Sequence, residues 1–210
     1  MNKEENKIEE VEEQLINSAV VSHKEQTFLQ KFSSIFFDAL KMLLLAVVTI
    51  ALVRYFLFKP FYVKGQSMEP NFHENNYLII DELTYRFRAP ERGEVVVLHS
   101  PTNNDYYLKR VIGLPGERVK IDDNKIIIYN EANPEGILIN ENYLDQQTTG
   151  TMVQTLDSDE YFVLGDNRGA SYDSRRFGPV KKEEIVGRAW LRGWPLNEIT
   201  KFSTPNYNLN

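Results

Sequence analysis

The stretch DYYLKRVIGLPGE, Asp105–Glu117, decides the fold that the sequence predicts. Its side chains alternate as they do in a β-strand, which sets Tyr107, Lys109 and Val111 on one face of a sheet. An ammonium group therefore stands where a third apolar side chain would be expected. Two interpretations are open. The charge protects an exposed sheet edge, or the lysine is buried so that its amine loses its proton and acts as a base.

The chain from Tyr62 onward is made of similar segments. Short apolar runs alternate with clusters of Pro, Gly, Asn and Asp, which indicates a mainly β domain over residues 62–200. Residues 122–158, rich in polar side chains and Gly, are expected to form an insertion outside the main sheet, and residues 201–210 a polar tail. The runs are YLII, GEVVVLHS, ERVKI, NKIIIYN, GILIN, EYFVLGD and EEIVGRAWLRGW.

A long apolar segment precedes this domain. The run MLLLAVVTIALV at Met42–Val53, with its flanks, extends over about residues 35–58, and a helix needs about 20 residues to cross a bilayer. Pro60 is expected to end that helix. A cleaved signal peptide fits less well, because the apolar run begins deep in the chain and no small-x-small cleavage site follows it. The sequence therefore predicts one uncleaved N-terminal transmembrane helix.

The residues before this helix form an acidic tail. Residues 1–34 hold seven glutamates and four lysines, so they carry half of the chain's net charge of −6. The tail is expected to be solvated and partly helical. Lysines flank the apolar segment on both sides in equal number, so the positive-inside rule does not orient the helix.

Composition excludes several classes of function. The chain has no cysteine, which removes thiol catalysis, disulfides and Cys-based zinc sites. Its three histidines, His23, His73 and His99, show no metal-ligand spacing, so neither a metal nor another cofactor is expected. A Ser-His-Asp triad through His73 or His99 stays open. No basic stripe indicates a nucleic-acid partner.

Two other stretches offer partners for Lys109. VKGQSMEPNF, Val63–Phe72, follows the apolar segment closely and contains Ser67 two residues after Gly65. A serine near a glycine is more often a turn residue than a nucleophile. YFVLGDNRGASYDSRRFGPV, Tyr161–Val180, runs from an apolar strand into a loop of hydroxyls and charges, which is typical of a packed polar network.

Together these stretches resemble signal peptidase I, the membrane-bound serine protease that removes signal peptides from exported bacterial proteins. The resemblance extends from the apolar segment to about Pro195. It implies an antiparallel β-sheet catalytic domain, preprotein signal peptides and the lipid bilayer as partners, and cleavage after Ala-x-Ala type sequences. It also implies a single-pass protein of the cell membrane, with residues 1–34 cytoplasmic and the catalytic domain outside. Four blocks carry it, in the family's order: GQSMEP, RGEVVVL, YYLKRVIGLPGE and GDNRGASYDSR.

The resemblance also implies roles for individual residues. Ser67 matches the nucleophile, Lys109 the general base, and Ser171 the serine that orients the lysine amine. Asp173 and Arg175 match an ion pair that supports the site. The chemistry agrees, because a serine hydroxyl needs a nearby base, and lysine, with an ordinary pKa of about 10.4, becomes one only when burial lowers its pKa.

Four more residues are candidates for the site. Asp166 and Arg168 match structural positions of the last block. Gly65 stands where some members of the family have a serine that helps to form the oxyanion hole. Met68 is a candidate for contact with substrate.

Three alternatives remain for the function. The first is a Ser-Lys protease that cleaves itself or a dedicated partner. The second is a catalytically silent, membrane-tethered assembly factor. The third is a Ser-His-Asp hydrolase that uses His99 and would stay active without Lys109.

Overall fold

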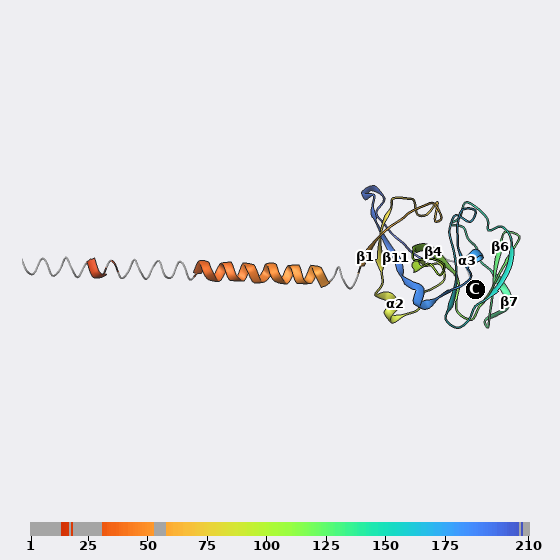
Figure 1. Cartoon of the computed structure of the whole chain (residues 1–210), viewed down its shortest axis with the longest axis horizontal. Coiled ribbons are helices and arrows are strands. Elements are labelled where there is room, and N and C mark those ends of the chain that lie inside the picture. The colour runs from red at the N-terminus through yellow and green to blue at the C-terminus, as the bar shows by residue number, and fades with distance from the viewer. Residues whose placement is uncertain (1–13, 17, 19–30, 53–57, 206, 208–210) are drawn as a thin grey trace, which may run out of the picture. The chain divides into compact units, whose positions relative to one another are not determined.

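The computed structural model describes residues 14–16, 18, 31–52, 58–205 and 207 (Figure 1). The chain divides into two compact units, Met1–Val53 and Arg54–Asn210, and each is described by itself. The acidic tail lies largely outside the described residues, since only residues 14–16, 18 and 31–34 of it are described, all of them helical.

The first unit contains one long apolar helix, Lys31–Leu52. Its 22 residues would extend about 33 Å, which matches a hydrocarbon core of about 30 Å. The expectation that the helix reaches Phe58 and stops at Pro60 is wrong. Both residues belong to strand β1, Phe58–Tyr62. Proline is tolerated there because β1 is the last strand on its side of the sheet.

The second unit is built on an antiparallel eight-stranded sheet in the order β1-β2-β11-β3-β4-β9-β10, with β12 paired to β11. An apolar helix followed by antiparallel β-sheets confirms the predicted fold class. Continuous apolar runs such as VVVLH form strands that are buried on both faces. The strands after β1 are β2 Tyr77–Asp81, β3 Val95–His99, β4 Tyr106–Gly113, β9 Glu160–Leu164, β10 Val180–Lys181, β11 Ile185–Trp194 and β12 Thr200–Lys201.

Short helical turns connect these strands, and none is longer than four residues in the described part of this unit. They are α2 Thr84–Phe87, α3 Ser174–Phe177, and the 3-10 turns η1 Lys182–Glu184 and η2 Leu196–Glu198.

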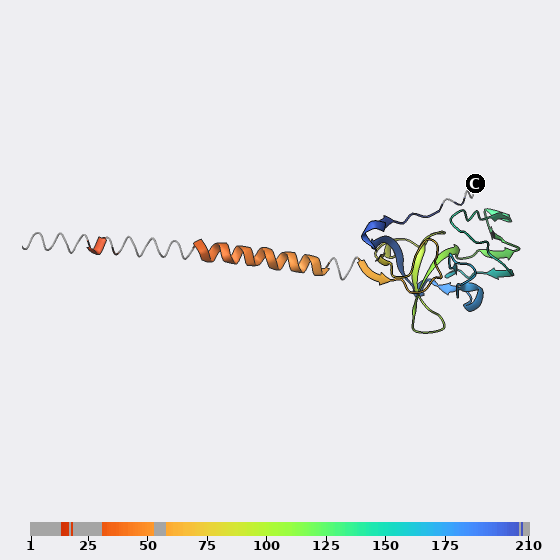
Figure 2. The same ribbon diagram turned by 90° about the horizontal axis from the view of Figure 1, so that it is seen from above.

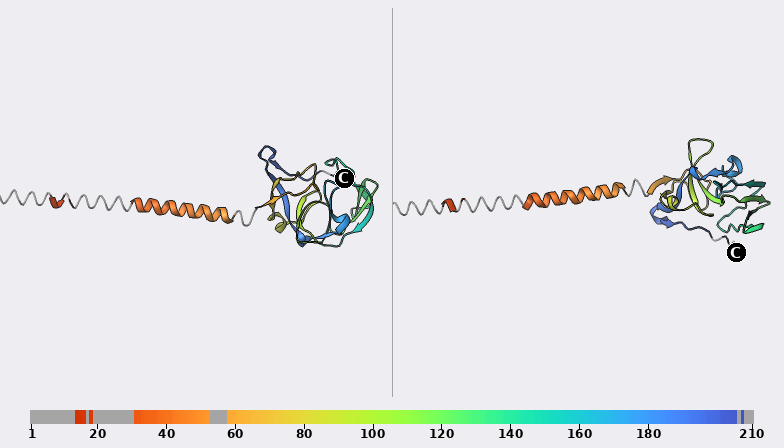
Figure 3. Two further views of the ribbon diagram at one scale, coloured as in Figure 1. Left: turned by 45° about the horizontal axis from the view of Figure 1, so that its top comes forward. Right: turned by 90° about the horizontal axis from the view of Figure 1, so that it is seen from below.

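The stretch expected as a polar insertion contributes to a second sheet. This sheet has four antiparallel strands in the order β7-β6-β5-β8, and it lies at the end of the unit opposite β1 and β11 (Figures 1 and 3). Asp123 and Asn124 adopt positive φ angles of 38° and 71°, which suits the two-residue turn that joins β5 to β6. The strands are β5 Arg118–Asp122, β6 Lys125–Asn130, β7 Asn133–Leu138 and β8 Thr151–Thr155.

Two residues of the stretch expected as a polar tail, Phe202 and Tyr207, are packed against the rest of the unit. The segment after β12 runs toward the second sheet (Figure 2). Phe202 packs on Phe72 with ring centroids 4.4 Å apart. Tyr207 is 5% exposed and belongs to the apolar cluster beneath the second sheet. Two aromatic side chains thus pack a stretch of mostly polar residues against the β-domain.

Candidate active site

A hydrogen bond joins Ser67 to Lys109. The Lys109 Nζ lies 2.8 Å from the Ser67 Oγ, although 42 residues separate the two in sequence. Lys109 comes from β4, in the interior of the main sheet. Ser67 lies on the loop between β1 and β2, where Gly65 adopts a φ of 77° and the buried Met68 anchors the loop in the core.

The environment of Lys109 weakens its hold on a proton. The side chain is 3% exposed, and burial lowers its pKa from 10.5 to about 8. The negative charges of Asp173 and Asp166 act in the opposite direction and raise this pKa, while Arg175 lowers it further. The Tyr107 ring lies 5.5 Å from Nζ. A lysine that protects an exposed sheet edge is therefore the wrong interpretation, because this amine is buried.

Ser171 packs beside the Ser67 loop. Its hydroxyl contributes to the lowered pKa of Asp173, yet its Oγ is buried and makes no hydrogen bond of normal geometry within the described part of the chain. A Cβ added at Gly165 would overlap both the Ser171 side chain and the Ser67 carbonyl oxygen. Because residue 165 is glycine, the Ser171 side chain and the Ser67 carbonyl can both lie close to its Cα.

Asp173 and Arg175 form a bidentate ion pair. Arg175 Nε and Nη2 each donate to Asp173 at 2.8 Å, and the Gly165 N–H donates to the same carboxylate at 3.0 Å. Burial raises the pKa of Asp173, but the hydrogen bonds and charge of Arg175 outweigh burial and hold this pKa below its ordinary value. Asp173 therefore stays ionised close to Lys109.

Asp166 is held from the reverse face of β4. Arg110 donates to its carboxylate from Nε at 2.8 Å and from Nη2 at 2.6 Å. Asn71 Nδ2 adds a third hydrogen bond at 2.9 Å. Burial alone would lower the pKa of Arg110, but Asp166 raises it, so the guanidinium remains charged. No sequence pattern pointed to Asn71, and Arg110 was not assigned a role, although alternation places Arg110 on the face opposite Lys109.

Asn167 holds the nucleophile loop, and the sequence analysis missed it too. Its backbone N–H donates to the Ser67 carbonyl at 3.1 Å, and its side-chain amide donates to the Gln66 carbonyl at 3.1 Å. Two hydrogen bonds from one residue thus fix the peptide on which Ser67 is carried.

A groove of about 450 Å³ leads to the two residues. One wall is Phe61–Gly65 and the other is Asp105–Lys109. Tyr106–Lys109 pair with β3, whereas the described pairing of β4 with β9 starts at Arg110. One backbone edge of this part of β4 is therefore free in the groove. Met68 lines it as well, but as a buried core residue.

The histidines lie apart from this arrangement. His99 stacks on Tyr106 with ring centroids 4.2 Å apart, and His73 lies 4.0 Å from Glu69. Neither hydrogen-bonds Ser67 in the described ranges. Among the described residues, no group of three or more His, Asp or Glu side chains could hold a metal ion.

A serine hydrogen-bonded to a buried lysine lies beside a free strand edge, in a β-domain that follows a helix of membrane-spanning length. These are the features expected of the class of membrane-anchored Ser-Lys peptidases.

Comparison with known proteins gives the family. Residues 36–194 match the family described as signal peptidase, peptidase S26. The signal peptidase I of Leptolyngbya laminosa is 33% identical over 184 residues, which cover 83% of this chain and 88% of that protein. The signal peptidase I of Bacillus amyloliquefaciens is 35% identical over 186 residues, 86% of this chain and 98% of that protein. The chain belongs to the signal peptidase family, peptidase S26.

A solved structure is also similar. A crystal structure of a signal peptidase I from Enterococcus faecalis is 33% identical in sequence, with a TM-score of 0.42. The similarity covers 48% of this chain and 97% of that one.

Proposed function

We propose that this chain removes signal peptides from preproteins with Ser67 as nucleophile and Lys109 as general base. The activity, that of a signal peptidase I and serine peptidase, follows from membership of the family. The assignment of the two residues rests on one observation, the 2.8 Å hydrogen bond from a buried Lys109 to Ser67. Membership of the family also argues against a silent assembly factor.

The first chemical step is acylation. Neutral Lys109 takes the Ser67 proton while Oγ attacks the carbonyl before the cut. The ammonium that forms lies near the carboxylates of Asp166 and Asp173, which favour the charged amine and so stabilise the transition state. Lys109 then gives its proton to the leaving amine. A water, activated by the same amine, releases the signal peptide from Ser67.

The Ser67 N–H is the candidate donor to the oxyanion. It makes no other hydrogen bond within the described residues, and Asn167 fixes the peptide that follows it. Gly65 has no hydroxyl, and its N–H already donates to Glu74 Oε1 at 3.1 Å. Gly65 therefore acts through the shape it gives the loop rather than as a donor.

Substrate is proposed to bind as an extended strand. The free edge of Tyr106–Lys109 can pair with a peptide backbone by adding a strand to the sheet. The opposite wall, Phe61–Gly65, limits the side chains that fit beside it. Small residues at the first and third positions before the cut let the carbonyl reach Ser67. A larger one displaces it, and about 1 Å of displacement can cost about a hundredfold in rate.

Two versions of one preprotein test this function, one with alanine and one with phenylalanine just before the cut. Purified full-length protein should cut the alanine version once, after the Ala-x-Ala sequence, and cut the phenylalanine version at most weakly. Mass spectrometry of the products reads the site. Equal cleavage of both, or cleavage of the enzyme alone, would favour the self-processing alternative.

The pH dependence of the reaction follows from Lys109. Because the neutral amine is the active form and its pKa is lowered to about 8, kcat/KM should rise as pH increases through about 8 and be low in acid. The stability of the folded state also increases as pH rises through this range. The unfolded chain binds this proton more tightly, so the folded state loses about 3 kcal/mol as pH falls from 10.5 to 8. A flat kcat/KM profile from pH 5 to 9 would contradict a lysine base.

We also propose that the helix Lys31–Leu52 crosses the cell membrane, with the acidic residues that precede it in the cytoplasm. One apolar helix of sufficient length supports the crossing, and export-side cleavage supports the direction. Protease added to intact spheroplasts should digest residues 58–207 and spare the acidic tail. Protection of the β-domain would reverse the assignment.

A further inference from the structure

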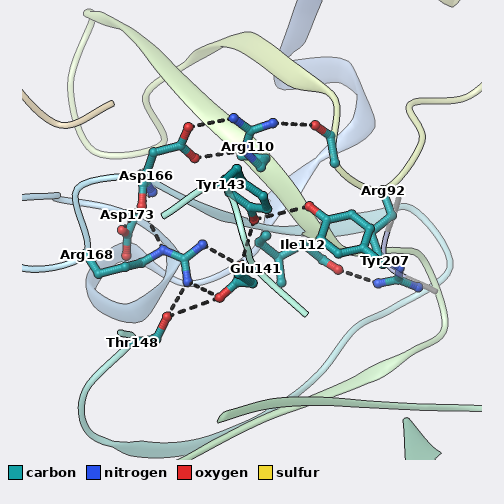
Figure 4. Close-up of polar contacts among 12 residues, drawn as sticks. Arg92, Arg110, Ile112, Glu141, Tyr143, Thr148, Asp166, Arg168, Asp173 and Tyr207 are labelled. Atoms are coloured by element: carbon teal, nitrogen blue, oxygen red, sulfur yellow. Dashed lines mark hydrogen bonds and ion pairs between the residues drawn. The ribbon is translucent and has the colours of Figure 1, made fainter. Parts of the chain in front are cut away.

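Glu141 lies on the segment that follows β7 of the second sheet. Its two carboxylate oxygens accept from Arg168 Nη1 and Nη2, each at 2.6 Å. The Arg168 side chain is fully buried, and Thr148 is its other side-chain partner (Figure 4). A buried guanidinium requires such a partner, because an unpaired buried charge is strongly destabilising.

Tyr143 is a second residue that hydrogen-bonds Glu141. Its hydroxyl donates to Glu141 at 2.7 Å and lies 3.2 Å from the Tyr207 hydroxyl. Its ring packs against the Arg110 guanidinium at 4.3 Å, and its carbonyl accepts from Asn71 at 3.0 Å. Tyr143 therefore contacts Arg110, the arginine that holds Asp166 (Figure 4). It also contacts Asn71, which donates to the same carboxylate.

Arg168 connects Glu141 to the other residues of the loop 165–175. Its Nε donates to the Gly165 carbonyl at 2.9 Å, and its own carbonyl accepts from Arg175 at 2.8 Å. Gly165 in turn donates to Asp173. Arg168 is thus bonded at both ends of the turn that carries Asp166 and Asn167.

We propose that Glu141 and Tyr143 are positioning residues for the peptidase reaction, through which the second sheet holds the loop of residues 165–175 against Ser67 and Lys109. Neither touches the reacting atoms. Glu141 acts through Arg168, and Tyr143 through Arg110 and Asn71. The proposal rests on the function assigned above to Ser67 and Lys109.

Loosening the loop has a defined effect on Lys109. The groups that face Lys109 are Ser67, the Tyr107 ring, and the charges of Asp166, Asp173 and Arg175. The last three all lie on the loop. A loop that moves away admits water to the amine and restores its proton affinity, since burial is the main cause of its lowered pKa.

The test compares Glu141→Gln, Glu141→Asp and Tyr143→Phe in the full-length protein. The control is Glu117→Gln, because Glu117 is likewise a carboxylate paired with an arginine, Arg92, at 2.5 Å, but does not contact residues 165–175. For each variant, kcat and KM for a preprotein are measured from pH 6 to 10, and thermal unfolding gives the folded fraction.

Per folded molecule, Glu141→Gln is expected to lower kcat/KM by about tenfold to a hundredfold at pH 7, mainly through kcat. Its pH midpoint should move upward. Glu141→Asp, which keeps the charge, should recover part of this loss, and Tyr143→Phe should show a smaller shift in the same direction. Glu117→Gln should lose stability while keeping the pH midpoint.

The proposal is overturned if Glu141→Gln matches Glu117→Gln in both kcat/KM and pH midpoint. If Glu141→Gln does not fold, Tyr143→Phe decides, and an unshifted midpoint there overturns it equally. Ser67→Ala distinguishes a failure of the proposed function from a failure of the positioning role of Glu141 and Tyr143. Activity in that variant would remove the proposed function, whereas an inactive Ser67→Ala beside an unaffected Glu141 series would remove only this inference.

Discussion

Ser67→Ala and Lys109→Ala are each expected to lower kcat by about four to six orders of magnitude, and the double variant by no more than either alone. A serine without its base and a base without its serine are equally inactive, because the 2.8 Å hydrogen bond makes them one unit. Rates of preprotein cleavage, measured at pH 8 with each purified variant, check this expectation.

Two controls make the result specific. Lys120→Ala removes a partly exposed lysine that pairs with Asp122 on the second sheet, and it should leave the rate unchanged. His99→Ala should also keep full activity, because His99 stacks on Tyr106 and does not bond Ser67. Retained activity in Lys109→Ala together with loss in His99→Ala would replace the Ser-Lys pair by a histidine base.

Gly165→Ala is expected to produce the second large effect. The added methyl group would overlap the Ser67 carbonyl and the Ser171 side chain, and a backbone atom cannot rotate away. The two loops must separate, which should cost about 1–3 kcal/mol of stability and about a hundredfold in kcat/KM. Thermal unfolding and cleavage rates measure the two losses.

Gly169→Ala is the matched control in the same loop. The nearest atom to its new methyl group is the flexible end of Gln146, at 3.3 Å, and Gly169 does not have a positive φ. Near-normal stability and activity are expected. Equal losses in the two variants would mean that the loop tolerates no side chain at either glycine, and that contact with Ser67 is not the cause.

Local pattern was enough to predict the main features of the fold. Alternation around Lys109 predicted a strand, and the unbroken apolar run predicted the long helix, because each depends on residues near in sequence. The end of that helix was predicted wrongly. Proline is compatible with both a helix stop and an edge strand, and only pairing with β2 places Pro60 in the latter.

The supporting residues of the site were harder to predict. Glu141 reaches Arg168 across 27 residues, and Arg110 reaches Asp166 across 56. No periodicity or spacing connects such partners, since the turns between them can have many lengths. Phe202 and Tyr207 were missed for a related reason. Two aromatic residues among polar ones carry no period, so their burial depends on which surface the segment crosses.

The free edge of Tyr106–Lys109 has a consequence for the range of proteins that can be processed. Main-chain N–H and C=O groups are the same in every extended peptide, so pairing along this edge does not depend on the identity of most residues bound there. In the proposed binding mode, discrimination is left to the few side chains that face the wall Phe61–Gly65. One enzyme can then serve many unrelated secreted proteins and still cut each of them at a single bond.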